Sequence, residues 1–435
     1  MKTVAFYTLG CKVNTYETEA VAQMFENDGY QRIDFKDDSA DVYVINTCTV
    51  TNTGDKKSRQ LIRRAIRKNP DAIIVVMGCY AQLAPKEVQQ IEGVDIILGT
   101  QGREHFMDYV KQYQNEREPI VAVTNILKQR SFEKMDVQRF AENTRAFLKI
   151  QEGCNNFCTF CIIPYARGKI RSRDFNELLV QAQELVNNGY KEIVLTGIHT
   201  AGYGEDLTEH NFAELLEALS TKVEGLKRLR ISSIEASQIT DEVLTVLKNS
   251  DVVVDHLHIP IQSGSDTILK RMRRKYLTDH YAKTIEKLRE IFPHLAVTTD
   301  LIVGFPGETE EEFVDTYNFI KRVGFSELHV FPYSIRNGTP AARMPEQVPE
   351  LVKSVRVSQM IALSDQMAKE YASHFENQML DVLVEEVDKD NPEYVIGHTT
   401  NYLRVRFEAS SNVLGEIVPV RIVKAGYPIN QGEML

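Results

Sequence analysis

The sequence contains no tryptophan, only six cysteines and no apolar run near the roughly 20 residues that a membrane span needs. Residues 1–10 lack the long apolar segment of a signal peptide. Six cysteines in a chain of 435 residues do not make the disulfide framework of a small secreted domain. We therefore expect a cytoplasmic protein that does not associate with membranes and keeps its cysteines reduced.

An excess of positive charge is also absent, since the net charge is −10. This balance argues mildly against nucleic acid as a partner, although local patches can override a global sum. Three stretches are strongly basic: residues 56–68, 167–173 and 271–275. Any one of them is most simply explained as a solvated face, so their importance depends on what they surround.

Three of the cysteines form a tight C-x3-C-x2-C cluster at Cys154, Cys158 and Cys161. Structural zinc requires four ligands, and the next histidine after the cluster is His199. A [4Fe–4S] cluster can be held by three thiolates, which leaves one iron without a protein ligand. The spacing therefore favours an iron–sulfur site with an open, catalytic position.

The other three cysteines, Cys11, Cys48 and Cys79, are far apart in the sequence, but their settings are alike. Each follows a short run rich in Val and Ile that predicts a buried parallel strand. These runs are residues 3–9, 41–47 and 72–77. Ligands bind at the carboxyl edge of such a sheet, so the three thiols can converge there. The alternative is three inert core cysteines, which are common.

The pattern of elements predicts an α/β protein of three parts. Residues 1–115 read as an N-terminal open parallel-sheet domain. Residues 140–370 contain six strand–helix units, which suit a central (βα)6 partial TIM barrel with its chemistry at the carboxyl ends of the strands. Residues 372–435 alternate like a small OB-like β-barrel.

The cysteine cluster, with Phe160 just before its last member, resembles the signature of the radical S-adenosylmethionine (SAM) enzymes. The C-terminal part resembles the TRAM module, an RNA-binding barrel. An upstream three-cysteine domain, a radical SAM barrel and a TRAM domain in this order resemble the methylthiotransferase family over essentially the whole chain.

This resemblance implies two [4Fe–4S] clusters and SAM as cofactors. Cys154, Cys158 and Cys161 would hold the cluster that cleaves SAM to a 5′-deoxyadenosyl radical. The other trio would hold an auxiliary cluster that carries the sulfur. Further contacts to SAM are expected from residues that follow the barrel strands: Gly197, Ser232, Ser233, Glu235, Gln262 and Gly304. No acid–base residue is assigned, because the clusters carry the chemistry.

The family modifies tRNA adenosine beside the anticodon, bearing a threonylcarbamoyl or an isopentenyl group, or an aspartate of a ribosomal protein. Residues 8–20, 154–169 and 196–204 look most like the threonylcarbamoyl branch. Lys12 would pair with the threonyl carboxylate, which an isopentenyl group lacks. The alternatives are another substrate of the same family, or an RNA-binding protein whose clusters are not catalytic.

The expected partners are a tRNA anticodon stem-loop, a low-potential electron donor of the flavodoxin or ferredoxin type, and a sulfur source. Basic residues near the barrel mouth are expected to contact tRNA phosphates, namely Arg167, Lys169, Arg171 and the stretch 56–68. In the last part, Arg404, Arg406, Arg421 and Lys424 are candidates for a basic face, although acidic residues outnumber basic ones there.

Overall fold

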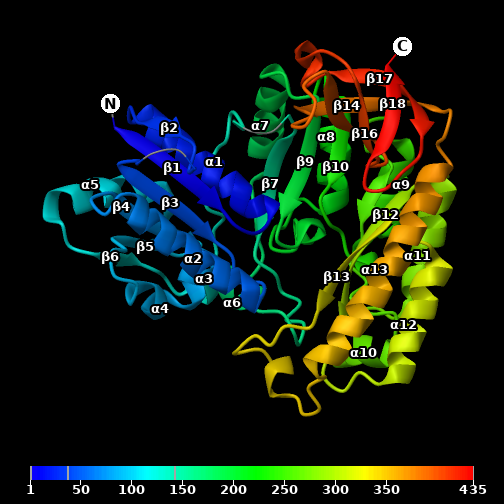
Figure 1. Cartoon of the computed structure of the whole chain (residues 1–435), viewed down its shortest axis with the longest axis horizontal. Coiled ribbons are helices and arrows are strands. Elements are labelled where there is room, and N and C mark those ends of the chain that lie inside the picture. Colours follow the sequence, from blue (N-terminus) through cyan, green and yellow to red (C-terminus); the bar gives the residue numbers. More distant parts are fainter. Residues whose placement is uncertain (1, 37–38, 142–143, 435) are drawn as a thin grey trace.

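The computed structural model describes residues 2–36, 39–141 and 144–434. Figure 1 shows an N-terminal α/β domain beside a larger strand–helix region, with a small β-barrel at one end of that region. In the described part of the chain, no helix has the length and apolarity that crossing a bilayer requires. The α/β class and the succession of three parts agree with the sequence-based expectation.

The N-terminal domain is a parallel six-stranded sheet in the order β2-β1-β3-β4-β5-β6. Its strands are β1 (Thr3–Thr8), β2 (Gln31–Ile33), β3 (Val42–Thr47), β4 (Ile73–Gly78), β5 (Ile96–Leu98) and β6 (Ile120–Ala122). Its helices are α1 (Lys12–Asn27), α2 (Asn52–Lys68), α3 (Cys79–Leu83), α4 (Pro85–Gln89) and α5 (Phe106–Glu116). Strands β3 and β4 are buried along their whole length because helices cover both faces of the sheet.

The parallel sheet extends beyond the expected domain end at residue 115, because β6 adds a sixth strand. The strand is only three residues long, and none of them is fully buried. Such a segment has too little apolar periodicity to be recognised in the sequence. The same reason explains why the short strand β2 was not expected.

The central region contains the six expected parallel strands. They are β7 (Ala146–Glu152), β9 (Glu192–Gly197), β10 (Arg228–Ile231), β11 (His256–His258), β12 (Ala296–Val303) and β13 (Glu327–Pro332). They form two sheets, β10-β9-β7-β8 and β11-β12-β13, joined by a parallel bridge between Leu229 and Val253. The two-residue strand β8 (Arg171–Ser172) is antiparallel to β7 and was not predicted.

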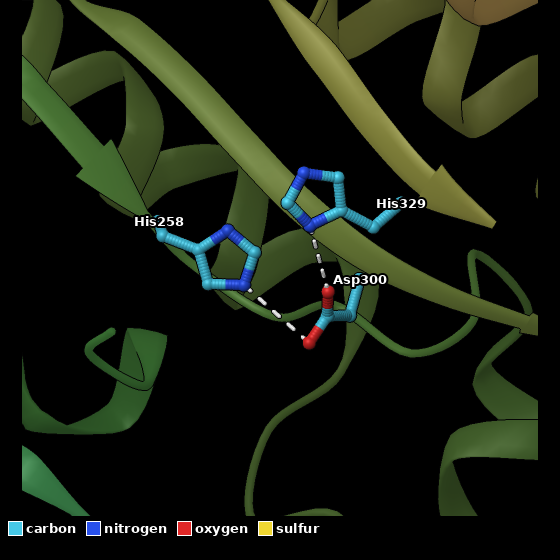
Figure 2. A group of neighbouring side chains, drawn as sticks. All are labelled: His258, Asp300 and His329. Carbon is cyan, nitrogen blue, oxygen red and sulfur yellow. Dashed lines mark hydrogen bonds and ion pairs between the residues drawn. The ribbon is translucent and has the colours of Figure 1, made fainter. Parts of the chain in front are cut away.

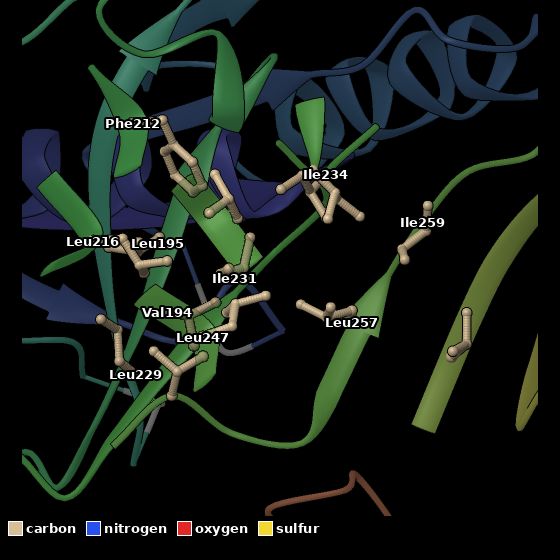
Figure 3. Packing of buried hydrophobic residues seen from close by; sticks show 14 of the residues in the cluster. Val194, Leu195, Phe212, Leu216, Leu229, Ile231, Ile234, Leu247, Leu257 and Ile259 are labelled. Carbon is tan, nitrogen blue, oxygen red and sulfur yellow. The ribbon is translucent and has the colours of Figure 1, made fainter. Parts of the chain in front are cut away.

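Eight helices of the described chain belong to this region: α6 (Ile163–Arg167), α7 (Phe175–Asn187), α8 (Phe212–Lys222), α9 (Asp241–Asn249), α10 (Asp266–Arg271), α11 (Thr278–Ile291), α12 (Glu310–Val323) and α13 (Glu350–Ser373). Helices α7 to α13 contribute, together with the strands, to one continuous apolar core. Figure 3 shows part of it, where Leu195, Leu216 and Leu229 pack between strands and helix. This core holds the carboxyl ends of the strands in place.

The C-terminal part is a closed barrel with the order β14-β15-β16-β18-β17. The strands are β14 (Met379–Val387), β15 (Tyr394–Thr399), β16 (Arg404–Glu408), β17 (Ile417–Lys424) and β18 (Asn430–Met434). All pairs are antiparallel except β16 with β18. This closed five-stranded arrangement is of the OB-like kind that the sequence predicted.

Tyr402 joins this small barrel to the central region. Its ring stacks on that of His256, with 4.5 Å between the centroids, and the Arg230 guanidinium lies 4.8 Å from its centroid. Arg228 also donates to the backbone oxygen of Asp381 at 2.8 Å. Aromatic and guanidinium contacts of this kind fix the C-terminal barrel against the amino ends of the central strands.

Candidate functional site

The three scattered cysteines lie together at the carboxyl edge of the N-terminal sheet. Cys11 directly precedes α1, Cys48 follows β3, and Cys79 begins α3 after β4. Strands β1, β3 and β4 are neighbours in the sheet, so their ends meet at one place. Cys11 is exposed, Cys48 is half-buried and Cys79 is buried.

Close backbone packing brings these three loops together. A Cβ at Gly10, whose φ is +104°, would lie 3.2 Å from the Cys48 Sγ, so the two cysteine loops touch. Asn14 ties the same loops by donating to the backbone oxygens of Leu9, at 2.6 Å, and Thr47, at 3.2 Å. The loops are therefore held in place by groups outside the cysteines.

The environment of these thiols suits a metal centre. Burial raises the pKa of Cys48 and raises that of Cys79 to about 12, and the charges of the neighbouring thiols act in the same direction. Unligated thiols of this kind stay protonated at neutral pH and are poor nucleophiles. A soft metal cluster takes the thiolate forms, so the three residues fit as ligands of an iron–sulfur cluster that leaves one iron open.

The second cysteine site is the loop between β7 and α6. The Cys161 amide donates to the Cys158 carbonyl at 3.0 Å, and the Asn156 amide donates to the Cys154 Sγ at 3.4 Å. Burial raises the pKa of Cys154 and that of Cys161 to about 12. These three residues lie at the carboxyl end of the first barrel strand and also fit a three-thiolate cluster.

Arg274 connects this loop to one of the expected SAM-binding residues. Its Nη1 lies 3.4 Å from the Cys158 Sγ and 3.0 Å from the Glu235 Oε1. The basic stretch 271–275 therefore contributes at least one buried side chain to the cysteine site. Ser232, which is partly exposed, shares a 3.2 Å hydrogen bond with Thr200.

The remaining expected SAM contacts differ in how well they are placed. Gly197 ends β9 beside Gln151, and Ser233 is partly exposed at the end of β10. A Cβ at Gly304, however, would lie 2.2 Å from the Lys353 Cγ. The Cβ side of Gly304 faces α13, so the absence of a side chain there allows Lys353 of the helix to approach the backbone.

A cavity of about 220 Å³ lies between the two cysteine sites. Its lining includes Cys161 and Gln262 from the barrel, and Val50 and Thr51 from the loop that carries Cys48. Phe331, which is 43% exposed, adds an aromatic wall. A cavity with a cysteine ligand and apolar surface can hold SAM or a nucleobase close to both clusters.

Asp300 also lines this cavity and lies between two histidines, as Figure 2 shows. Its carboxylate is 3.4 Å from the His258 Nε2 and 3.3 Å from the His329 Nδ1. The hydrogen bond and charge of Asp300 raise the pKa of His329 despite its partial burial. This group could not be predicted from a local pattern, because its members come from three different strands.

Lys12, at the start of α1, is not among the residues that line this cavity; the groups that interact with its charge are Tyr402, Arg145 and Arg230, toward the amino ends of the central strands. Burial lowers its pKa, Tyr402 raises it, and the charges of Arg145 and Arg230 lower it further. Its ammonium makes no hydrogen bond or ion pair with any residue that the structure describes. It is a half-buried cation close to Arg145 and Arg230, and the charge of Glu192 only partly offsets them by raising its pKa.

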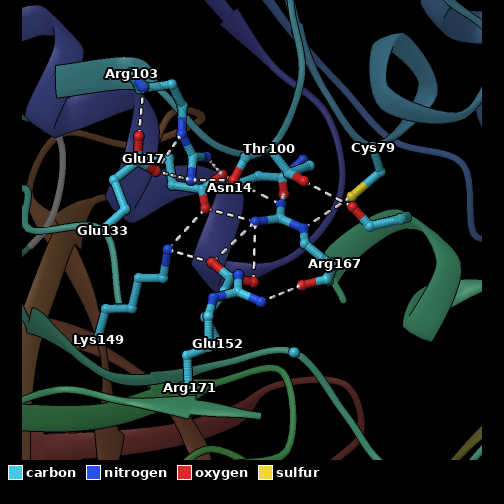
Figure 4. Close-up of polar contacts among 12 residues, drawn as sticks. Asn14, Glu17, Cys79, Thr100, Arg103, Glu133, Lys149, Glu152, Arg167 and Arg171 are labelled. Atoms are coloured by element: carbon cyan, nitrogen blue, oxygen red, sulfur yellow. Dashed lines mark hydrogen bonds and ion pairs between the residues drawn. The ribbon is translucent and has the colours of Figure 1, made fainter. Parts of the chain in front are cut away.

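Two of the predicted phosphate contacts are corrected by the structure. Arg167 and Arg171 are buried, and Figure 4 shows them in a network of charged side chains near Cys79. Arg167 pairs with Glu17 at 2.5 Å, and Arg171 donates to the backbone oxygen of Arg167 at 3.0 Å. Neither side chain can reach a phosphate, whereas Lys169 is exposed.

The sequence missed most of this network, because its members are far apart in the chain. Glu17 on α1 also pairs with Arg103 at 2.6 Å and with Lys149 at 2.9 Å. Glu133 pairs in turn with Arg103 at 2.5 Å. In the structure, Glu17 lies among residues of α1 that are mostly buried, a position that a charged side chain occupies only with partners.

Basic residues remain exposed on one face of α2, which starts beside the Cys48 loop. They are Lys56, Lys57, Arg63, Arg64 and Arg67. In the C-terminal barrel, by contrast, Arg404, Arg406 and Arg421 each pair with a carboxylate at 2.5–2.6 Å. Lys424 is exposed. The candidate surface for nucleic acid is therefore α2, not the expected basic face of the small barrel.

Comparison with known proteins agrees with this geometry. Residues 148–320 match the radical SAM superfamily, and residues 3–99 match uncharacterized protein family UPF0004. The structure is similar to that of the radical SAM methyltransferase TsrM from Kitasatospora setae, with a TM-score of 0.57, 14% identity and coverage of 79% of this chain and 77% of that one. At that identity the likeness concerns the fold alone.

Two relatives of known name extend the match to the full chain. Threonylcarbamoyladenosine tRNA methylthiotransferase MtaB of Bacillus subtilis (strain 168) is 64% identical over 100% of this chain and 97% of its own length. A tRNA-2-methylthio-N(6)-dimethylallyladenosine synthase of Clostridium botulinum is 35% identical, over 96% of this chain and 94% of its own. The protein therefore belongs to the methylthiotransferase family of radical SAM enzymes.

Proposed function

We propose that this protein inserts a methylthio group at C2 of N6-threonylcarbamoyladenosine, next to the anticodon of tRNA. The observation that carries the proposal is 64% identity to an enzyme of that name over the whole chain. The cavity that Cys161 lines is also bordered by Val50 and Thr51, which closely follow Cys48, and this agrees with it, because the reaction needs both a radical and a sulfur atom at the same substrate carbon.

The bond that reacts cannot be deprotonated in water, so acid–base side chains are of no use to the reaction. When bound, the two [4Fe–4S] clusters and SAM supply the radical and the methylthio group. Cys154, Cys158 and Cys161 hold one cluster in the proposal, and the other trio holds the auxiliary one. The protein itself binds these groups, orients them and keeps the substrate between them.

We assign the binding of SAM to Gly197, Ser232, Ser233, Glu235 and Gln262 in the barrel. An electron donor of the flavodoxin or ferredoxin type and a sulfur source complete the set of partners. The cytoplasm is the expected location, because it is where tRNA is modified. The exposed cations of α2 and Lys169 are proposed to hold the tRNA backbone.

The decisive experiment uses the anaerobically reconstituted protein with SAM, a reductant and two tRNA substrates. One tRNA carries threonylcarbamoyladenosine and the other isopentenyladenosine, and the nucleosides are analysed by mass spectrometry. We expect methylthiolation of the first only. Methylthiolation of the isopentenyl tRNA, or of a ribosomal protein aspartate, would assign the alternative substrate. A protein that does not cleave SAM at all would be a non-catalytic iron–sulfur protein.

Lys12 is proposed to bind the threonyl carboxylate. A hydrogen bond between charged groups is worth about 1.5–3 kcal/mol, so Lys12→Met should lower kcat/KM for the threonylcarbamoyl tRNA by roughly 10- to 100-fold. Lys12→Arg keeps the charge and should retain much more activity. Equal rates for Lys12→Met and the unaltered protein would contradict the pairing.

The α2 surface predicts a salt-dependent affinity for tRNA. Each phosphate contact that is lost should reduce the slope of log K against log salt by about 1. The triple variant Lys57→Gln, Arg63→Gln and Arg64→Gln should therefore bind more weakly and with a flatter slope, measured by filter binding at several salt concentrations. Lys321→Gln, an exposed lysine of α12, is the control. An unchanged slope would place the tRNA elsewhere.

A further inference from the structure

One arginine of the barrel reaches a cysteine of the N-terminal domain. Arg167 ends α6 and is the sixth residue after Cys161. Its side chain is completely buried, and its Nε lies 3.1 Å from the Cys79 Sγ, to which it donates. The loop that carries one cysteine site thus continues directly into the residue that contacts the other.

The rest of this guanidinium is held equally firmly. Its Nη1 lies 2.5 Å from the Glu17 Oε1, and its Nη2 donates to the Asn14 Oδ1 at 2.6 Å. Glu152 lies on a second side, 3.3 Å from Nη1. Figure 4 shows the guanidinium between these groups and Cys79. Five donors in a rigid plane leave Arg167 one orientation, with its Nε directed at the sulfur.

Asn14 extends the contact to the other two cysteine loops. The same amide that accepts from Arg167 donates to the backbone oxygens of Leu9 and Thr47, just before the Cys11 and Cys48 loops. Arg167 is therefore connected to all three loops, to one directly and to two through a single side chain. A merely structural ion pair would not need the contact to sulfur.

An N–H donor at a thiolate ligand has a defined effect on a cluster. Hydrogen bonds to the sulfurs and nearby positive charge stabilise the form with the additional electron, so they raise the reduction potential. They also fix the direction of the ligand. The barrel site has a comparable contact between Arg274 and Cys158, at 3.4 Å, which indicates that both sites use a buried arginine in this way.

We propose that Arg167 is a positioning residue for the auxiliary cluster: it orients the Cys79 thiolate, raises the reduction potential of the cluster and ties it to the loop of the SAM-cleaving site. This inference rests on the proposed function, because it takes Cys11, Cys48 and Cys79 as ligands.

The test isolates one cluster. A parent variant with Cys154, Cys158 and Cys161 replaced by alanine is reconstituted anaerobically, and its iron content and reduction potential are measured by an EPR-monitored titration. Arg167→Lys in this parent should keep the cluster but shift its potential to a more negative value. Arg103→Lys is the matched control, because Arg103 lies in the same buried network but contacts Glu17, Glu133 and Thr100 in the described chain, not a cysteine.

An unchanged potential in Arg167→Lys would overturn the proposal, as would an equal shift in Arg103→Lys. A parent that takes up no cluster would show instead that the proposed auxiliary site is wrong. A second measurement needs no substitution at Arg167: with arginine labelled by ¹⁵N, pulsed EPR of the reduced parent should show a nitrogen coupling from the guanidinium. Its absence would overturn the contact even if Arg167→Lys did not fold.

Discussion

Glu17→Gln is expected to destabilise the protein by about 3–5 kcal/mol, because it removes the shared counter-ion of three buried cations. Arg103, Lys149 and Arg167 all contact this carboxylate within 2.9 Å, and they come from both domains. The midpoint of urea unfolding, followed by circular dichroism, measures the loss. An N-terminal domain that unfolds before the barrel would show that docking is affected as well.

The control and the pH dependence follow from the same structure. Glu433→Gln breaks an exposed pair with Arg421 and should change stability little.

Burial raises the pKa of Glu17, but Arg103, Arg167 and Lys149 together hold it well below its usual range. Its stabilising effect is therefore complete above its unfolded pKa of about 4.3 and is lost as the pH falls towards the native pKa. Equal urea midpoints for Glu17→Gln and Glu433→Gln would contradict this account.

Cys158→Ala is expected to abolish both SAM cleavage and methylthiolation, whereas Cys48→Ala should abolish methylthiolation only. The reason is that the two trios are proposed to hold separate clusters, of which the first makes the radical. Chromatography of 5′-deoxyadenosine measures cleavage, and nucleoside mass spectrometry measures methylthiolation.

Iron analysis provides the matching control. The reconstituted protein should contain about eight irons, and replacing one complete trio by alanine should leave about four. Loss of both activities in Cys48→Ala with its barrel cluster intact would mean that radical formation depends on the auxiliary site. Zinc in place of iron would rule out the proposed chemistry.

The sequence predicted the elements that depend on long apolar runs. Strands β3 and β4 and the carboxyl-edge position of Cys48 and Cys79 follow from such runs, and the structure brings these cysteines together as expected. Because the carboxyl ends of parallel strands lie at the same edge of the sheet, residues that follow different strands in the sequence can be predicted to lie close together.

The charged residues could not be placed in this way. Arg167 lies in a basic stretch that resembles an exposed surface, and its partner Glu17 is 150 residues away. Burial of a charge is decided by tertiary pairing, which a local pattern does not contain. Asp300 and its two histidines were missed for the same reason.

The stacking of Tyr402 on His256 has a mechanical consequence. The C-terminal barrel packs against the amino ends of the central strands, and Arg228 and Arg230 donate hydrogen bonds to its backbone. These contacts hold the barrel in one orientation relative to the central region. A ligand bound to the C-terminal barrel would therefore lie at a fixed distance from the cavity.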